Sequence, residues 1–252
     1  MNNLENNENV WDVPWHALGE GMKNNPGRNL RHDYILRIIE ENDLTNILDY
    51  GAGDGQLVSK LISKGRKAVG WEQSIVGVER ANEISNDLNL DKNVFLTPDD
   101  PENYWKSFDV VIMSEVVEHI EFPEFDLVDI KKLLKDDGYF IATVPSGPMS
   151  YFDRHIGHFK HYSEKSFKIL LIQCGFTDVN VRSFGFPIVN LVRVICLILN
   201  KKMPGIVMNT QSNSLISRIS LVIEKLLYKS SMNENVLGWQ LIAIARQSVN
   251  GK

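Results

Sequence analysis

The sequence has little of what marks secreted, membrane-spanning or disulfide-stabilised proteins. It contains two cysteines in 252 residues, Cys174 and Cys196, and they form no CxxC pair. We therefore expect buried thiols in a reducing compartment. No uninterrupted apolar run reaches the roughly 18 residues that a spanning helix needs. The first nine residues are rich in Asn and Glu, without the basic start and apolar stretch of a signal peptide. These absences predict a cytoplasmic globular protein.

An excess of positive charge is also absent. The formal net charge is −5 and the sequence pI is about 5.7, which argues against a protein that binds nucleic acid through a basic face. Hydrophobic residues make up 43% of the chain, enough to build a full core, so disorder and coiled coil are excluded as overall descriptions. The length fits one α/β domain with insertions or two small domains.

Short apolar runs alternate with segments of helical periodicity along most of the chain. We expect helices at 31–41, 55–64, 75–88, 125–134 and 163–174, and strands at 46–50, 67–72, 93–97, 108–114, 139–144, 179–183 and 237–245. Ser163 is the expected N-cap of the last of these helices, and Gly175 its left-handed end. Such alternation with short loops predicts an α/β fold with a doubly wound, mostly parallel sheet, formed by residues 31–185 and 232–252.

Two segments fall outside this alternation. Residues 1–30 are polar, and we expect them to form an irregular N-terminal arm. Residues 186–231 carry six basic side chains and one acidic one, a local charge of +5, and include two apolar helical segments at 188–199 and 215–228. We expect this insertion to pack on the open end of the sheet. It is either a helical lid or a cationic, apolar surface that contacts a membrane or admits a lipid-like acceptor.

The most informative segment is a glycine-rich loop, residues 47–55, with the sequence ILDYGAGDG. An apolar strand that leads into alternating glycines and then a helix predicts a ligand crevice at the carboxyl end of that strand. Glu72 follows Gly51 by 21 residues, where an acid can accept the hydroxyls of an adenosine ribose. The glycine spacing departs from the GxGxxG dinucleotide fingerprint, and Asp49 and Asp54 disfavour a pyrophosphate. The loop therefore favours S-adenosylmethionine (SAM), which is cationic, over NAD; a tight turn without a ligand is the other interpretation.

A second cluster directly follows the fourth expected strand. Glu115, Glu118 and His119 are spaced i, i+3 and i+4, so they can project from one side of a helical turn. Three later histidines lie in the polar segment after the fifth strand, on the same side of the sheet: His155, His158 and His161. Such oxygen and nitrogen ligands suit Mg²⁺, Mn²⁺, Fe²⁺ or Zn²⁺, which could bind vicinal hydroxyls of an acceptor. A metal-free site with His119 or His158 as the base, and a structural role for the cluster, are the alternatives.

Four blocks in this order resemble a known family. They are LDYGAGDG at 48–55, Glu72, FDVVIMSEVVEHI at 108–120 and LLKDDGYFIATVPS at 133–146, with a looser fifth block at 158–176. The sequence resembles the class I SAM-dependent methyltransferases, most closely the branch that contains the ubiquinone-biosynthesis O-methyltransferases. The Glu-x-x-Glu-His pattern with a later His is also similar to the metal site of small-RNA 2′-O-methyltransferases. The family fold implies a Rossmann-like sheet of seven strands, of which the last is antiparallel.

The resemblance also implies roles for individual residues. Asp49, Gly51 and Gly53 would line the methionine end of SAM, and Glu72 would bind the ribose. Asp99 or Asp100 would reach the adenine amino group, Ser114 would contact the cofactor through its backbone, and Arg31 would reach the SAM carboxylate. The candidate catalytic residues are Glu118, His119 and His158, and the candidate metal ligands are Glu115, Glu118, His119 and His158.

The expected function is therefore SAM-dependent methyl transfer by in-line displacement. The expected acceptor is a hydroxyl oxygen of a small molecule, a sugar or a lipid-linked compound, and the insertion at 186–231 could bring the protein to a membrane surface. Two alternatives stay open: an RNA 2′-O-methyltransferase, and an inactive SAM-binding scaffold protein. The acidic main domain argues against the RNA substrate because it has no evident basic track for phosphates.

Overall fold

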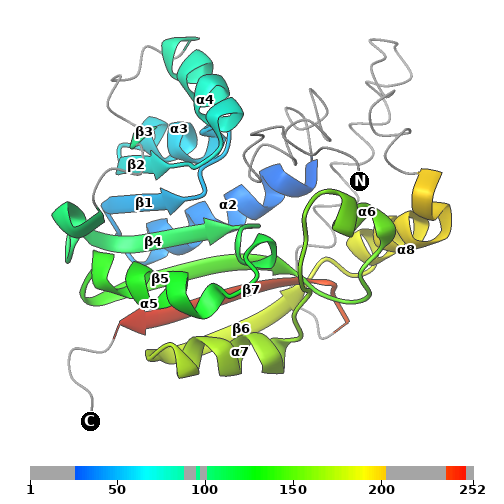
Figure 1. Cartoon of the computed structure of the whole chain (residues 1–252). Helices are drawn as coiled ribbons and strands as arrows, with labels where there is room; N and C mark the ends of the chain where they lie inside the picture. The colour runs from blue at the N-terminus through cyan, green and yellow to red at the C-terminus, as the bar shows by residue number, and fades with distance from the viewer. Residues whose placement is uncertain (1–25, 88–94, 97–100, 203–236, 248–252) are drawn as a thin grey trace, which may run out of the picture.

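The computed structural model describes residues 26–87, 95–96, 101–202 and 237–247 (Figure 1). Its strands are β1 (Asn46–Tyr50), β2 (Lys67–Trp71), β3 (Phe95–Leu96), β4 (Phe108–Ser114), β5 (Leu134–Pro145), β6 (Phe176–Phe184) and β7 (Gln240–Gln247). Its α-helices are α2 (Pro26–Glu41), α3 (Gln56–Ser63), α4 (Ile75–Asp87), α5 (Pro123–Leu133), α6 (Tyr151–His155), α7 (Glu164–Gln173) and α8 (Ile188–Leu199). Short 3₁₀ turns are η3 (Pro101–Tyr104), η4 (Val117–His119) and η5 (Asn200–Lys202).

In the described part of the chain, seven strands form one sheet in the order β3-β2-β1-β4-β5-β7-β6. The pairs from β3 across to β5 are parallel. Strand β7 runs antiparallel to both of its neighbours, β5 and β6. This topology confirms the expected doubly wound sheet with an antiparallel last strand. Because parallel strands end at one edge, the loops that follow β1, β2 and β4 meet there.

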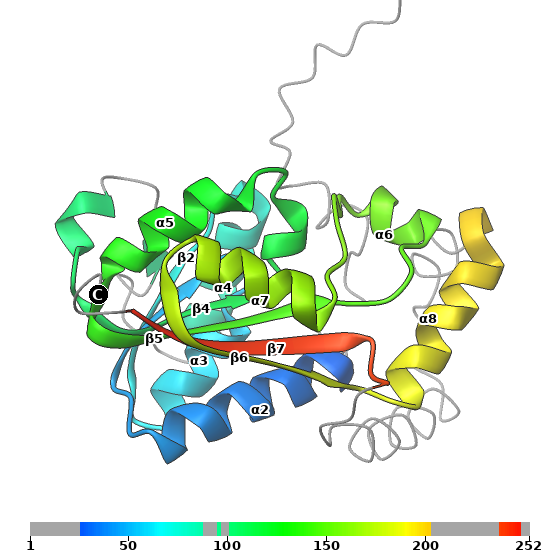
Figure 2. The ribbon, with the colours of Figure 1, turned by 90° about the horizontal axis from the view of Figure 1, so that it is seen from below.

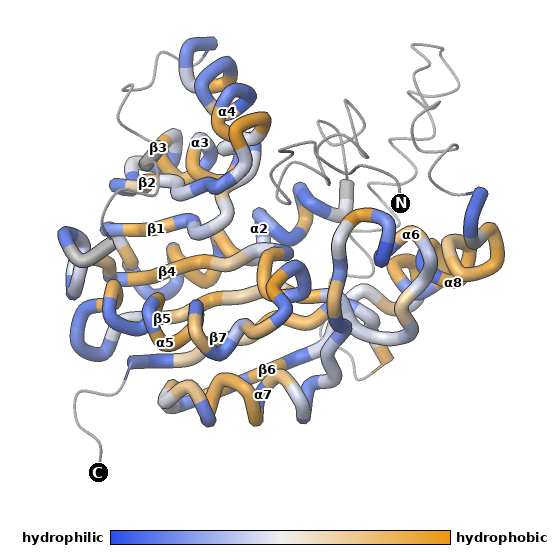
Figure 3. The backbone as a smooth tube through the Cα atoms, viewed as in Figure 1, coloured by the Kyte–Doolittle hydropathy of each residue, from blue (hydrophilic) through white to orange (hydrophobic). Residues whose placement is uncertain are grey.

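Helices cover both faces of the sheet (Figure 2). Helices α2 and α3 lie on one face, and α5 and α7 on the other. The apolar run of β4 is unbroken because the strand has a core on each face. Val111 and Met113 pack in the core beneath α5 and α7, and Val110 and Ile112 pack in the core beneath α2 and α3. A strand with a core on each side needs apolar residues at every position. Figure 3 shows this hydrophobic character along β4 and β5.

Several boundaries differ from those expected. Helix α2 begins at Pro26, so it includes residues 26–30, which were expected in the N-terminal arm. Proline suits a first helical position because the amide hydrogen that it lacks would have no partner there. Strand β5 begins at Leu134 because Leu134 pairs with Phe108 ahead of a register shift. The predicted end of α7 is confirmed, since Gly175 has a φ of +83°.

Some expected features lie outside the described residues. They are the arm up to residue 25, the helix at 215–228 and the adenine-contacting Asp99 or Asp100. Among the described helices, none has the length and apolar character needed to cross a membrane.

The expected N-cap of α7 is present, since the Ser163 Oγ accepts a hydrogen bond of 3.1 Å from the Ser166 amide.

Candidate functional site

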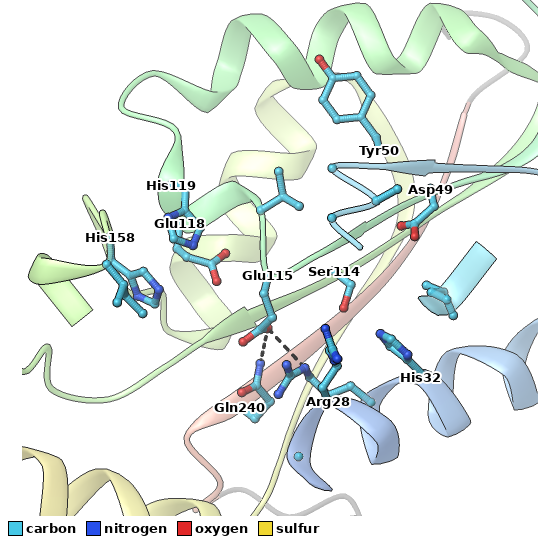
Figure 4. A pocket seen from close by; sticks show the side chains of 18 of the residues that line it. Arg28, His32, Asp49, Tyr50, Ser114, Glu115, Glu118, His119, His158 and Gln240 are labelled. Atoms are coloured by element: carbon cyan, nitrogen blue, oxygen red, sulfur yellow. Dashed lines mark hydrogen bonds and ion pairs between the residues drawn. The ribbon is translucent and has the colours of Figure 1, made fainter. Parts of the chain in front are cut away.

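A cavity of about 420 Å³ lies at the edge where β1, β2 and β4 end (Figure 4). All the candidate site residues in the described part of the chain line it: Arg31, Asp49, Gly51, Gly53, Glu72, Ser114, Glu115, Glu118, His119 and His158. In the view of Figure 4, the Glu118 and His119 side chains lie on one side of Ser114 and Glu115, and Asp49 lies on the other. The two clusters that the sequence singled out therefore face one cavity.

The turn after β1 requires glycine at Gly51. This residue has a φ of +80°, in the left-handed region that other residues rarely adopt. A Cβ atom at Gly51 would also stand only 2.6 Å from Cγ2 of Val116. The Gly51 and Ala52 amides both donate to the Trp71 carbonyl oxygen, at 2.7 and 3.0 Å. The loop is thus held tightly against the end of β2, and its backbone faces the cavity without an intervening side chain.

Glu72, directly after β2, is fixed by this loop. Its Oε2 accepts a hydrogen bond of 2.7 Å from the Gly53 amide, and its Oε1 accepts one of 2.7 Å from the Ser74 amide. The residue is 8% exposed. A carboxylate oxygen can accept more than one hydrogen bond. The fixed carboxylate can therefore still receive ligand hydroxyls, as the expected ribose contact requires.

The cavity is acidic, both at the glycine loop and over its whole lining. Burial, followed by the nearby charges of Glu72 and Asp54, raises the pKa of Asp49 to about 8. Among the described lining residues there are seven carboxyl groups and three arginines. One of those arginines, Arg28, already pairs with Asp54 at 3.0 Å. A cationic ligand would relieve the remaining repulsion, whereas a pyrophosphate would add to it. The residues present therefore fit a cofactor with a sulfonium and an ammonium group.

Glu118 is the most unusual group in the cavity wall. It is fully buried in η4, and neither carboxylate oxygen has a hydrogen-bond partner among the described residues. Burial and then the charge of Glu115 raise its pKa well above the ordinary value. The Glu118 carboxylate lies close to two imidazoles, and potential ligand atoms of Glu118, His119 and His158 all fall within 4.8 Å of one another. A buried carboxylate without a partner is costly, and a bound cation would offset that cost.

Glu115 does not belong to this three-residue group. It precedes η4 with a φ of +60°, so the expected i, i+3, i+4 helical geometry does not apply to it. Its Oε1 instead accepts hydrogen bonds from Thr143 Oγ1 at 2.9 Å and from Gln240 Nε2 at 2.6 Å. Arg31 Nε lies 3.9 Å from the same oxygen. Three of the four expected ligands, without Glu115, therefore form the group whose possible ligand atoms lie within 4.8 Å of one another. Glu115 instead connects β4 with β5, β7 and α2.

The two imidazoles of the group are neutral near pH 7. Burial lowers the pKa of His119 to about 4. Burial and the neighbouring His119, His161 and Arg193 lower the pKa of His158 to about 2. Their ring centroids are 4.6 Å apart and the rings are nearly perpendicular, at 83°. A neutral imidazole has one nitrogen with a free lone pair, which can bind a metal or accept a proton.

A second group of possible metal ligands shares His158 and includes Asp153 and His161. Arg193 of α8 already places a cation there, with Nη2 3.3 Å from Asp153 Oδ2 and 3.1 Å from His161 Nδ1. A metal at this position would be repelled by the guanidinium. Of the two groups, the one formed by Glu118, His119 and His158 is therefore the better metal site. His161 Nε2 lies 3.1 Å from His158 Nδ1.

Helix α8, the described part of the insertion, forms a wall of the cavity. Four of its residues at helical spacing line it: Val189, Val192, Arg193 and Cys196. Phe152 and Ile156, at α6, continue this largely apolar wall. Other α8 residues point away and are exposed, among them Leu191, Ile195 and Ile198. The insertion therefore has one side toward the cavity and another, apolar side toward solvent.

Sequence reasoning missed several residues of the site. Arg28 and His32 come from the first turns of α2, Gln240 from β7 and Arg193 from α8. None of these stands in a local motif, because each reaches the cavity only through the packing of a distant element. Asp153 did have a detectable signal: Ser150 and Asp153 form a capping box at the start of α6.

Comparisons with known proteins bear on the family to which the chain belongs. The sequence profile of a family described as "Methyltransferase domain" matches residues 23–181. A ubiquinone biosynthesis O-methyltransferase of Pelagibacter ubique is 33% identical over 134 residues, which cover 51% of this chain and 55% of that protein. Its mitochondrial counterpart in Candida albicans is 27% identical over 171 residues, covering 60% of this chain and 49% of that protein. The chain thus spans about half the length of these curated relatives.

A solved structure extends the likeness to nearly the whole chain. The SAM-dependent methyltransferase of Thermotoga maritima has a TM-score of 0.60 at 15% identity, covering 95% of this chain and 100% of that one. At such low identity the likeness concerns the fold alone. The family profile, in contrast, covers well over half of the sequence and includes both the glycine loop and the Glu118 cluster. The chain belongs to the methyltransferase domain family.

Proposed function

We propose that this protein transfers a methyl group from SAM to a hydroxyl oxygen of a small-molecule acceptor. The observation that carries the proposal is the single cavity that contains both the acidic glycine-loop end and the Glu118, His119 and His158 group. Methyl transfer needs donor and acceptor aligned in one enclosed space. The resemblance to ubiquinone biosynthesis O-methyltransferases supports oxygen as the atom that receives the methyl group.

The chain's contribution at the cofactor end is binding and orientation. SAM, when bound, supplies a methyl group that is already activated by its sulfonium sulfur. Asp49 provides a buried carboxyl group near the cationic end, and Glu72, held by the Gly53 amide, accepts the ribose hydroxyls. Arg31, whose Nε has no hydrogen-bond partner among the described residues, is suited to the SAM carboxylate. Ser114 contributes backbone contacts at the end of β4.

The group at the other end handles the acceptor hydroxyl. Either neutral imidazole, His119 or His158, can accept the hydroxyl proton as the methyl group transfers. The partnerless carboxylate of Glu118 favours the version in which Glu118, His119 and His158 hold a divalent cation. Such a cation would lower the pKa of a coordinated hydroxyl. In the metal-free version one imidazole removes the hydroxyl proton, and in the metal version the cation held by the three residues would make that proton easier to remove.

The wall formed by α8 and α6 indicates which chemical class of acceptor the cavity would bind. Val189, Val192 and Cys196 from α8, with Phe152 and Ile156, give this side of the cavity a largely apolar lining. An aromatic or lipid-linked acceptor with adjacent hydroxyls would place its apolar part against this lining. Among the described residues that line the cavity, an RNA backbone would meet three arginines, Arg28, Arg31 and Arg193, against seven carboxyl groups.

The decisive experiment is incubation of the purified protein with methyl-labelled SAM and a panel of acceptors. The panel should hold catechols with and without an alkyl chain, a short RNA and buffer alone, with mass spectrometry of the products. We expect one added methyl group on a catechol oxygen, with the alkylated compound preferred. Labelled RNA would favour the RNA alternative. Binding of NADH without binding of SAM would overturn the proposal.

We also propose that the outward side of α8 contacts anionic membranes. Leu191, Ile195 and Ile198 are exposed, by 55%, 45% and 74%, and two lysines, Lys201 and Lys202, follow the helix. Apolar side chains beside basic ones are typical of helices that lie on membrane surfaces. Co-sedimentation with vesicles containing phosphatidylglycerol should fall in an Ile195→Glu, Ile198→Glu double variant. Phe125→Glu, which changes an exposed aromatic residue of α5, is the matched control; equal sedimentation of all three proteins would contradict this proposal.

A further inference from the structure

His32, in the second turn of α2, is a buried histidine in the wall of the cavity. It is 6% exposed, and its Nδ1 is buried without a hydrogen-bond partner among the described residues. In the view of Figure 4 its ring extends from α2 toward Ser114 and Asp49, near the ends of β4 and β1. Buried polar side chains in folded proteins usually have a partner. The His32 ring is therefore placed to bind a ligand group in this part of the cavity.

The surroundings of His32 are positively charged, although the cavity as a whole is acidic. Burial lowers the pKa of His32 well below its ordinary value, and the charges of Lys60, Arg31 and Arg28 lower it further. Arg28 is itself paired with Asp54, so Lys60 and Arg31 contribute most of the positive charge. A neutral imidazole carries one N–H donor. Such a donor beside cations favours an anionic group of a ligand over a cationic one.

SAM carries both signs of charge at its amino-acid end, an ammonium and a carboxylate. The carboxyl groups of the glycine loop suit the cationic groups, so the carboxylate requires a separate place. Arg31 lines the cavity next to His32 in the sequence, and its Nε has no hydrogen-bond partner among the described residues. We infer that His32 is a cofactor-binding residue that donates a hydrogen bond to the SAM carboxylate beside Arg31. The inference rests on the proposed function, since it takes SAM as the ligand of this cavity.

The two side chains have different parts in this recognition. The Arg31 guanidinium supplies positive charge, whereas the His32 ring supplies a neutral donor whose direction is restricted, because closely packed interiors leave a buried ring little room to turn. A ligand with the same sulfonium and ammonium groups but no carboxylate would gain nothing from this donor. His32 therefore helps to select SAM over decarboxylated SAM.

Isothermal titration calorimetry of the full chain with SAM and with decarboxylated SAM tests this role. Decarboxylated SAM keeps the adenosine, the sulfonium and the ammonium, so only the carboxylate differs. We expect His32→Phe, which keeps a ring but has no donor, to raise the Kd for SAM about tenfold or more, as expected for a lost hydrogen bond to a charged group. The Kd for decarboxylated SAM should be nearly unchanged. His32→Asn, which retains an N–H donor, should recover most of the affinity for SAM.

The control is His155→Gln, at an exposed histidine of α6, which should bind both ligands like the wild type. An equal loss of affinity for both ligands in His32→Phe would assign His32 to the structure of the cavity and overturn the inference. An unchanged Kd for SAM in that variant would overturn it as well.

A crystal structure of the wild type with SAM decides the contact even if no variant folds. A ring nitrogen of His32 should lie within about 3.2 Å of a carboxylate oxygen of the cofactor, and a ring beyond hydrogen-bond distance would overturn the inference. The proposed function can fail separately. A wild type that binds SAM but methylates no acceptor would contradict methyl transfer, while the binding data still decide the carboxylate contact. A wild type that binds no SAM would overturn both.

Discussion

The carboxylate of Glu72 accepts a hydrogen bond of 2.7 Å from the backbone amide of Gly53. This contact joins the end of β2 to the glycine loop that follows β1, across 19 residues of sequence. It orients a buried carboxylate toward the space where the cofactor is expected. Two features that the sequence shows separately, a glycine turn and an acid about 20 residues later, line one cavity in the structure.

Replacement of Glu72 by alanine should weaken cofactor binding. Loss of hydrogen bonds to a charged group costs about 1.5–3 kcal/mol, so we expect the Kd for SAM to rise about tenfold or more. The kcat at saturating SAM should change little, because Glu72 lies at the cofactor end. Isothermal titration calorimetry provides the measurement, and Glu79→Ala, on the exposed side of α4, serves as the control. An unchanged Kd would remove Glu72 from the cofactor site.

Asp49 should make the stability of the ligand-free protein depend on pH. Its pKa is raised from 3.8 to about 8 in the folded state, so between these values the folded protein binds more protons than the unfolded chain. The free energy of unfolding therefore falls as pH rises, by up to about 1.4 kcal/mol per pH unit. In Asp49→Asn this slope should be reduced in denaturant titrations from pH 5 to 8.

The same variant should bind SAM more weakly. A cationic cofactor favours the ionised carboxylate, so wild-type affinity should rise as pH approaches 8 and binding should release protons. Asp49→Asn should be more stable than the wild type at pH 8 yet have a higher Kd for SAM. A variant that loses stability at pH 8 while it keeps the wild-type affinity would contradict both expectations.

The Glu118 group should affect turnover and not cofactor affinity. We expect Glu118→Ala and His119→Ala to keep the Kd for SAM within about twofold and to lower kcat, by roughly 10² or more if His119 acts as the base. Chelators separate the two versions of the site. A rate that falls with EDTA and returns with added Mg²⁺, Mn²⁺, Fe²⁺ or Zn²⁺ supports the cation, whereas an unchanged rate leaves only the metal-free base.

A larger side chain on the cavity side of α8 should exclude the acceptor. Val192 lines the cavity, and we expect Val192→Trp to raise the KM for the acceptor severalfold while the Kd for SAM is maintained. Leu191→Trp places the same side chain on the outward side of α8, where Leu191 is 55% exposed, and should behave like the wild type. Equal KM values in the two variants would show that α8 does not bound the acceptor space.

Much of the fold could be predicted because its signals are local. Strand β4 has an unbroken apolar run from Val110 to Met113, and the glycine loop lies between a strand and a helix. Each can therefore be recognised in a short stretch of sequence. The position of Glu115 could not be predicted in this way. Its spacing from Glu118 and His119 fits a helical turn. In the structure, however, Glu115 has a positive φ and lies before η4, and its carboxylate accepts hydrogen bonds from Thr143 and Gln240.

The sequence by itself determined the order of strands and helices, the turn that must contain glycine at Gly51, and the chemical types of the candidate residues, since these depend on local periodicity and backbone sterics. Only the tertiary structure decided which side chains share a cavity. Glu118 is buried without a hydrogen-bond partner among the described residues, and Arg193 of α8 lies beside His161. Both arrangements require segments that are far apart in the chain to pack together. Long-range packing leaves no short pattern in the sequence.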